Sequence, residues 1–221
     1  MPAILACDPA WQGGDETVIS YRQGSQVQVL ERFKLKNGMD HSFTYSRLSH
    51  WERVVKADRV FIDQAEGTTL YTLARQHGKH HWVLIPFGAL PTDQADPKDS
   101  EYANMRAMMY YRVREFIDKG GSISVRELAW KDETMKQLTW AKEDRHKQTG
   151  KKKVNSKIEI KTDYGKSPDI ADSIALLFAD DVVERLDGHD TIEDQAGNSG
   201  PFIRNDEYDP YNIVDISYRD V

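Results

Sequence analysis

The sequence predicts an α/β protein built on a mixed five-stranded central sheet that is flanked by helices. Three short strand-like segments follow one another near the start of the chain. The segments after them alternate between helical and strand-like patterns. Hairpins between the first three strands make them antiparallel, whereas right-handed crossovers through helices make the last two strands parallel.

Apolar runs and turn residues mark the first three strands. Residues 3–8 form a short apolar run that ends in an acid, and a turn rich in proline and glycine follows it. Residues 17–21 and 26–34 then alternate between apolar and polar side chains around a bend at Gly24 and Ser25. This alternation is typical of two paired strands with one buried face.

The next segments alternate between helix and strand. Helical spacing of apolar residues covers 42–56, an apolar strand covers 60–63, a helix covers 68–77, and a third apolar strand covers 82–86. A loop rich in proline and aspartate at 88–100 separates them from the last third of the chain.

The last third is predicted to be mainly helical. A long helix at 102–119 ends at two glycines, a short helix is possible at 125–138, and 157–161 alternates like one arm of a hairpin. A final apolar helix covers about 168–186, with Ser167 as its N-cap and Pro168 at its first position.

Charge is unevenly distributed along the chain. The net charge is −6, but residues 187–221 hold nine acids against two arginines, and 142–166 hold nine lysines or arginines against four acids. We therefore expect a domain at 1–186 with a basic segment, followed by an acidic and poorly ordered tail at 187–221. No apolar run reaches the length of a membrane span, and we expect no signal peptide at the start of the chain. The single Cys7 excludes internal disulfides, which fits a reducing cytoplasm.

Four acids lie where strands end or a helix begins. Asp8 and Asp63 each end a predicted buried strand, and parallel neighbours place such residues at one edge of the sheet. Asp169 and Asp172 lie three residues apart in the first turns of the final helix, close to one helical face. Carboxylates gathered in this way predict a site for Mg²⁺ or Mn²⁺ and phosphodiester chemistry.

Other polar residues leave more than one interpretation open. Asp15 and Glu16 are either additional ligands or solvated loop residues, and the five histidines before residue 100 favour a surface turn over a metal site. Arg106 either points to a phosphate or forms a surface salt bridge. We expect lysines of 147–161 to contact the DNA backbone without reading sequence, namely Lys151, Lys152, Lys153 and Lys157. The alternative for Lys151, Lys152 and Lys153 is a solvated loop.

Several motifs occur in an order typical of one family. They are Asp-Pro-Ala-x-x-Gly-Gly-Asp-Glu-Thr-Val-Ile at 8–19, Phe-Ile-Asp at 61–63, Asn-x-Arg-Ala at 104–107 and Ser-Pro-Asp-Ile-Ala-Asp at 167–172. Over about residues 3–186, the chain resembles the C-terminal nuclease domain of the large terminase subunit of tailed bacteriophages. The resemblance implies an RNase H-like fold and a metal-dependent endonuclease that cuts concatemeric viral DNA during genome packaging.

The resemblance also implies a set of site residues. Asp8, Asp63 and Asp172 correspond to the metal-binding acids of the family, Asp169 is a possible fourth, and two Mg²⁺ or Mn²⁺ ions are implied. The turn after Asp63 has fewer glycines than the family pattern, so Glu66 could share the role of the second acid.

The resemblance implies double-stranded DNA as substrate, the host cell cytoplasm as location, and a packaging ATPase domain, a small terminase subunit and a portal as partners. No Gly-x-x-x-x-Gly-Lys-[Ser/Thr] motif occurs, so we expect the chain to be a domain excised from its ATPase. The alternatives are another RNase H-like nuclease, of resolvase or RNase H type, a sugar-kinase-like ATPase, and a non-catalytic DNA-docking module. A substrate panel and a metal-dependent nicking assay discriminate among the DNA-acting candidates.

Overall fold

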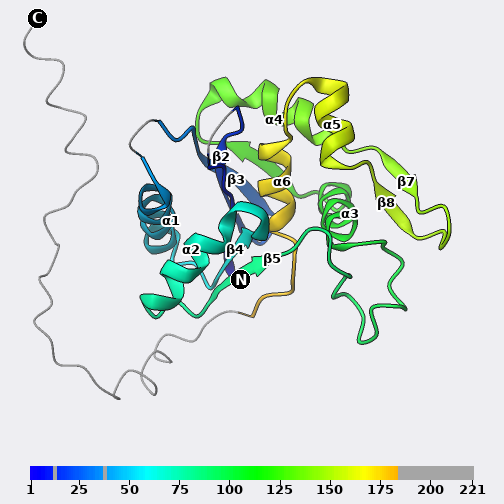
Figure 1. Cartoon of the computed structure of the whole chain (residues 1–221), viewed down its shortest axis with the longest axis horizontal. Helices are drawn as coiled ribbons and strands as arrows, with labels where there is room; N and C mark the ends of the chain where they lie inside the picture. The colour runs from blue at the N-terminus through cyan, green and yellow to red at the C-terminus, as the bar shows by residue number, and fades with distance from the viewer. Residues whose placement is uncertain (12–13, 37–38, 184–221) are drawn as a thin grey trace, which may run out of the picture. The chain divides into compact units, whose positions relative to one another are not determined.

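A six-stranded mixed sheet forms the centre of the part of the chain that the structure describes (Figure 1), with strand order β5-β4-β1-β2-β3-β6. The computed structural model describes residues 1–11, 14–36 and 39–183. The sheet contains β1 (Ala3–Asp8), β2 (Thr17–Gln23), β3 (Gln26–Phe33), β4 (Arg59–Asp63), β5 (Trp82–Ile85) and β6 (Ser122–Val125). The helices are α1 (His41–Val55), α2 (Gln64–Gln76), α3 (Met105–Asp118), α4 (Lys131–Leu138), α5 (Lys157–Tyr164) and α6 (Asp169–Leu176), with a 3-10 turn at Leu128–Trp130 and a small hairpin of β7 (Glu143–Arg145) and β8 (Lys152–Val154).

The predicted directions of the first five strands are confirmed. β1, β2 and β3 pair antiparallel in sequence, while β4 pairs parallel with β1, and β5 pairs parallel with β4. The predicted strand count is wrong, because β6 adds a sixth strand parallel to β3. Its four residues, Ser-Ile-Ser-Val, give too short an alternation to stand out in a sequence.

Two predicted elements near the end of the described chain also differ. The segment expected as a hairpin arm at 157–161 is instead the start of helix α5. Ser156 and Glu159 cap the N-terminus of this helix with reciprocal hydrogen bonds between side chain and backbone. The final helix ends at Leu176, well before the predicted residue 186. Residues 184–186, the predicted domain boundary and the acidic tail at 187–221 lie outside the described residues.

Helices cover both faces of the sheet, with α3 and α6 packed on one face and α1 and α2 on the other. Side chains along each strand alternate between these two layers. In β1, Ile4 and Ala6 pack in the layer of α3 and α6, whereas Leu5 and Cys7 pack in the layer of α1 and α2. In β4, Phe61 likewise belongs to the layer of α6. The same alternation directs the strand-ending acids, two residues further on, to the α6 side.

The histidine-rich turn between α2 and β5 has a structural role. His81 Nε2 and Lys79 Nζ both pair with the carboxylate of Glu52 near the end of α1. Burial raises the pKa of Glu52, but the hydrogen bonds from His81 and Lys79 outweigh burial and lower the pKa to about 2. The turn thus fastens α1 to the start of β5.

Within the described residues, no helix is both long enough and apolar enough to cross a membrane.

Candidate active site

Asp8 and Asp63 lie side by side at the carboxyl ends of two parallel strands. Cys7 of β1 is in register with Ile62 of β4, so the acids that follow them are neighbours across the strand pair. Both side chains are directed to the α6 side by strand alternation, and both residues are buried. The sequence prediction that these two acids share one edge of the sheet is therefore confirmed.

Helix α6 brings a third acid to the same edge. Asp172 lies in its first turn and is fully buried. The neighbouring Ser173 holds the helix against β2, because its Oγ hydrogen-bonds Val18 O at 3.1 Å and Ser20 Oγ at 2.9 Å. These contacts fix where Asp172 stands relative to the strand ends.

The start of α6 depends on a side chain that the sequence analysis missed. The N-cap position is Pro168, not Ser167 as predicted. Gln137 of α4 supplies the missing acceptor, because its Oε1 accepts hydrogen bonds from the backbone N–H groups of Ile170 and Ala171 at 2.8 and 3.3 Å. No local pattern links residue 137 to residue 170, so only the tertiary structure identifies this cap.

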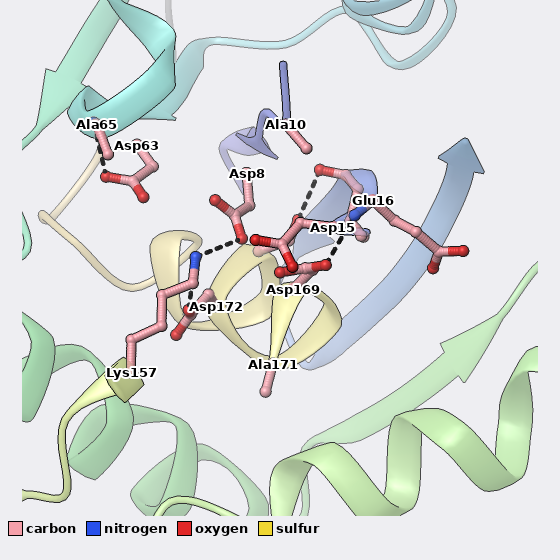
Figure 2. A network of polar contacts seen from close by, with 12 residues as sticks. Asp8, Ala10, Asp15, Glu16, Asp63, Ala65, Lys157, Asp169, Ala171 and Asp172 are labelled. Atoms are coloured by element: carbon pink, nitrogen blue, oxygen red, sulfur yellow. Dashed lines mark hydrogen bonds and ion pairs between the residues drawn. The ribbon is translucent and has the colours of Figure 1, made fainter. Parts of the chain in front are cut away.

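Lys157, the first residue of α5, extends its ammonium group into the acidic cluster (Figure 2). Its Nζ lies 3.4 Å from Asp172 Oδ2 and 3.6 Å from Asp8 Oδ2. Burial lowers the pKa of Lys157, but the surrounding carboxylates, Asp8 foremost, outweigh it and raise the pKa above its usual value. The sequence analysis placed Lys157 among the DNA-contacting lysines, whereas its observed partners are two of the three acids.

Burial makes the negative charge of this cluster costly. Burial, together with the charges of Asp172 and Asp63, raises the pKa of Asp8 well above its usual value, although Lys157 opposes the shift. Burial also raises the pKa of Asp63, against the hydrogen bond from the Ala65 N–H. A cation placed among these groups therefore stabilises their ionised forms.

Asp169 points away from the three clustered acids toward the loop before β2 (Figure 2). Its Oδ2 accepts a hydrogen bond from the Glu16 N–H at 2.8 Å, and burial raises its pKa. Asp15 pairs with Lys161 at 2.7 Å, and the Glu16 carboxylate pairs with Arg32. Asp169 thus ties α6 to this loop, and Asp15 and Glu16 have partners outside the cluster.

Of two further candidate residues, Glu66 lies apart from the cluster and Arg106 packs behind it. Glu66 is exposed in the first turn of α2. Arg106 is buried, and its Nη2 lies 3.1 Å from Asp172 Oδ1, so its guanidinium faces the cluster from inside the protein. Tyr110, one helical turn further along α3, also hydrogen-bonds Asp172 and was missed, although its spacing of four residues from Arg106 places both on one helical face.

The three lysines predicted to bind DNA lie at or near the β7–β8 hairpin and have partners within the protein. Lys151 Nζ donates to the carbonyl oxygen of Lys98 at 3.0 Å, Lys152 Nζ pairs with Glu101 at 2.6 Å, and Lys153 Nζ lies 3.8 Å from Asp144. Their binding to DNA stays a prediction.

The acidic cluster has the chemistry of a hard-cation site. Across the described residues, no group of three or more acids, histidines and cysteines is close enough together to hold a metal as it stands. Oxygen donors nevertheless face one another from two strands and a helix, and the buried Asp172 Oδ2 accepts no hydrogen bond. An ammonium group already pairs with two of these carboxylates, so the cluster as it stands accommodates a positive charge.

Neither a family profile nor a curated protein matches the sequence. Solved structures do match the fold. The nuclease domain of the large terminase subunit gp2 of bacterial virus Sf6 is 19% identical, covers 80% of this chain and 88% of its own, and has a TM-score of 0.65. Its K428A mutant with manganese and β-thujaplicinol has a TM-score of 0.66, again at 19% identity over 80% of this chain and 88% of its own.

A second phage protein has a related structure. The large terminase nuclease from thermophilic phage G20c is 15% identical, covers 80% of this chain and 81% of its own, and has a TM-score of 0.50. The chain is thus an α/β protein with an RNase H-like fold. Within that class, its architecture is that of the nuclease domains of phage large terminase subunits.

Proposed function

We propose that the protein is a divalent-metal-dependent DNA endonuclease that cleaves concatemeric viral DNA during genome packaging. The observation that carries the proposal is the convergence of Asp8, Asp63 and Asp172 from β1, β4 and α6 at one edge of the sheet. The fold shared with terminase nuclease domains supports it.

Asp8, Asp63 and Asp172 are the residues proposed to hold two Mg²⁺ or Mn²⁺ ions, with Asp8 between the other two acids. Structures of the Sf6 nuclease domain with manganese and with calcium support a cation site on this fold. When bound, such ions supply a hydroxide nucleophile at neutral pH and stabilise the leaving oxygen of the cleaved phosphodiester.

The chain's own residues prepare this site in three ways. Burial of the three acids excludes water and strengthens their attraction for a cation. The strand ends fix Asp8 and Asp63, while the Ser173 contacts hold Asp172 through α6. Lys157, when it is charged, favours the ionised form of Asp8, and we propose that its ammonium also pairs with a phosphate oxygen of bound DNA.

Asp169 has a second proposed role beside that of a possible fourth ligand. Its hydrogen bond to the Glu16 N–H holds the loop between β1 and β2 next to the cluster. We also propose double-stranded DNA as the substrate, with a packaging ATPase domain, a small terminase subunit and a portal as partners in the host cell cytoplasm.

A plasmid digestion tests the proposed activity. Supercoiled DNA should be nicked and linearised with Mn²⁺ or Mg²⁺, and Ca²⁺ should support binding but little turnover because its looser coordination does not hold the reacting groups in line. Undiminished cutting in EDTA contradicts the metal mechanism. Binding without cutting in Mn²⁺ favours the DNA-docking alternative, and a preference for branched or hybrid duplexes favours a resolvase or RNase H.

A further inference from the structure

Two side chains of α3 meet the same oxygen atom of Asp172. The Tyr110 hydroxyl donates to Asp172 Oδ1 at 2.7 Å, and Arg106 Nη2 donates to the same oxygen at 3.1 Å. Both side chains are buried, so water does not compete with them for this carboxylate. They reach Asp172 from behind, on the α3 side of the helix that carries it.

The two oxygens of Asp172 consequently differ in their hydrogen bonding. A carboxylate oxygen has two lone pairs, and two donors engage both lone pairs of Oδ1. Oδ2 is buried, accepts no hydrogen bond, and lies 3.4 Å from Lys157 Nζ. Only Oδ2 is therefore presented to a positive charge on the side of Asp8.

The Tyr110 hydroxyl is the donor that sets this orientation most directly. It makes the shorter of the two bonds, and because its oxygen accepts from Arg106 Nη2 at 3.4 Å, its single proton is left to donate to Asp172. Arg106 divides its donors, since its Nη1 donates to the carbonyl oxygen of Asn155 and its Nη2 also lies 3.4 Å from the Tyr110 hydroxyl. Carboxylate rotation about χ2 is soft, so an Asp without such donors turns easily.

We propose that Tyr110, supported by Arg106, is a positioning residue that holds Asp172 so that only Oδ2 is offered to a divalent cation. The inference rests on the proposed function, in which Asp172 is a metal ligand. It assigns to α3 the task of orienting a ligand that α6 carries. Donors that orient a ligand in this way commonly change metal affinity by about 10–100-fold when removed.

Tyr110→Phe tests the inference, because it removes one hydroxyl and keeps the ring. Mn²⁺ affinity is measured by electron paramagnetic resonance of free Mn²⁺ during titration of the protein, with no DNA present. We expect Tyr110→Phe to bind Mn²⁺ about 10-fold more weakly or worse. Tyr111→Phe is the matched control, since its ring packs on Tyr102 rather than on Asp172, and it should bind as the wild type does.

Thermal melting separates orientation from general damage. A weaker Mn²⁺ affinity in a Tyr110→Phe protein that keeps most of its melting temperature supports the proposal. If this variant is poorly folded, Arg106→Lys tests the same oxygen, because one ammonium then replaces the two guanidinium nitrogens that bind Asn155 and Asp172 separately, and we expect it too to weaken Mn²⁺ binding. Wild-type affinity in a folded Tyr110→Phe or Arg106→Lys protein overturns the proposal.

Asp172→Asn distinguishes failure of this inference from failure of the proposed function. If the wild type binds Mn²⁺, Asp172→Asn does not, and Tyr110→Phe binds normally, then the metal site stands and the positioning role is wrong. If the wild type itself binds no Mn²⁺, both the proposed metal site and the inference that rests on it are wrong.

Discussion

Replacing Lys157 by alanine should reveal how strongly the acidic cluster needs a cation. At an effective dielectric constant of about 20, each ion pair of 3.4–3.6 Å corresponds to about 5 kcal/mol of Coulomb attraction. Desolvation offsets much of this attraction, and the lysine side chain is 37% exposed, so solvent screening reduces it further. Removing one partner of a buried pair costs about 3–5 kcal/mol, and we expect a value near the lower end.

For a protein of this size, a loss of about 3 kcal/mol lowers the melting temperature by about 6–12 °C. Lys157→Ala should show this loss in EDTA and recover much of it in Mn²⁺, since Mn²⁺ at about 100 times its dissociation constant contributes about 2.7 kcal/mol. The wild type should gain less from Mn²⁺, because its lysine must first be displaced. Differential scanning calorimetry with and without Mn²⁺ measures both effects.

Lys161→Ala is the control for this experiment. Lys161 lies one turn further along α5 and pairs with Asp15, in a bridge whose side chains are 47% and 35% exposed. Such a surface pair contributes about 0–1 kcal/mol, so this variant should melt close to the wild type. An unchanged melting temperature for Lys157→Ala in EDTA, or an equal gain from Mn²⁺ in both proteins, would refute the electrostatic reasoning.

Three further predictions concern the acids of α6, the carboxylate of Glu52 and the lysines of the β7–β8 hairpin. In plasmid nicking with Mn²⁺, Asp172→Asn should abolish cleavage while keeping the fold and DNA binding, and Asp169→Asn should leave a reduced rate; the opposite order would contradict the assignment. The pKa of Glu52 is lowered from 4.5 to about 2, which corresponds to about 3 kcal/mol of folding stability, or about 2 kcal/mol after solvent screening. This contribution to stability is fully present above pH 4.5 and is lost as the pH falls toward 2. Urea unfolding of Glu52→Gln should therefore show a stability gap at pH 7 that closes near pH 2, and a constant gap would rule out this linkage. Replacing Lys151, Lys152 and Lys153 by alanine should weaken DNA binding equally for all sequences and flatten its salt dependence by up to about 3 units of slope, and less where intramolecular partners already neutralise them; an unchanged slope would make them structural.

The strand order near the site could be predicted from the sequence because its signals are local. An apolar run that ends in an acid, as at Asp8 and Asp63, predicts both a strand and the residue at which it ends. Parallel pairing then brings the two ends together, which the register of Cys7 with Ile62 confirms. Periodicity and general rules of connection were enough for this part of the fold.

The position of Lys157 could not be predicted in the same way. The alternation of Ile158 and Ile160 favours a strand, whereas Ile160 is buried and Ile158 is 78% exposed on the helix that forms there. The capping pair of Ser156 and Glu159 was the signal for a helix start. Even with that helix assigned, only tertiary packing shows that its first lysine turns toward Asp8 rather than toward solvent.

Tyr110 and Gln137 escaped prediction for a related reason. Each acts on a residue more than 30 positions away, Tyr110 on Asp172 and Gln137 on the first amides of α6. In the sequence, one is an aromatic residue of an amphipathic helix and the other a polar residue of a short helix. Neither pattern carries information about a distant partner.

The alternation of side chains in β1 means that the number of residues in this strand determines where Asp8 lies. Ile4 and Ala6 point to the α6 layer, and Asp8 keeps the same parity. One residue inserted between Ala6 and Asp8 would turn the acid into the apolar layer of α1 and α2, whereas two inserted residues would return it to the α6 side but about 7 Å further along the strand. The length of β1 therefore fixes both the face on which Asp8 lies and its position along the strand. Insertions or deletions within these six residues should abolish activity, whereas neighbouring loops should tolerate them.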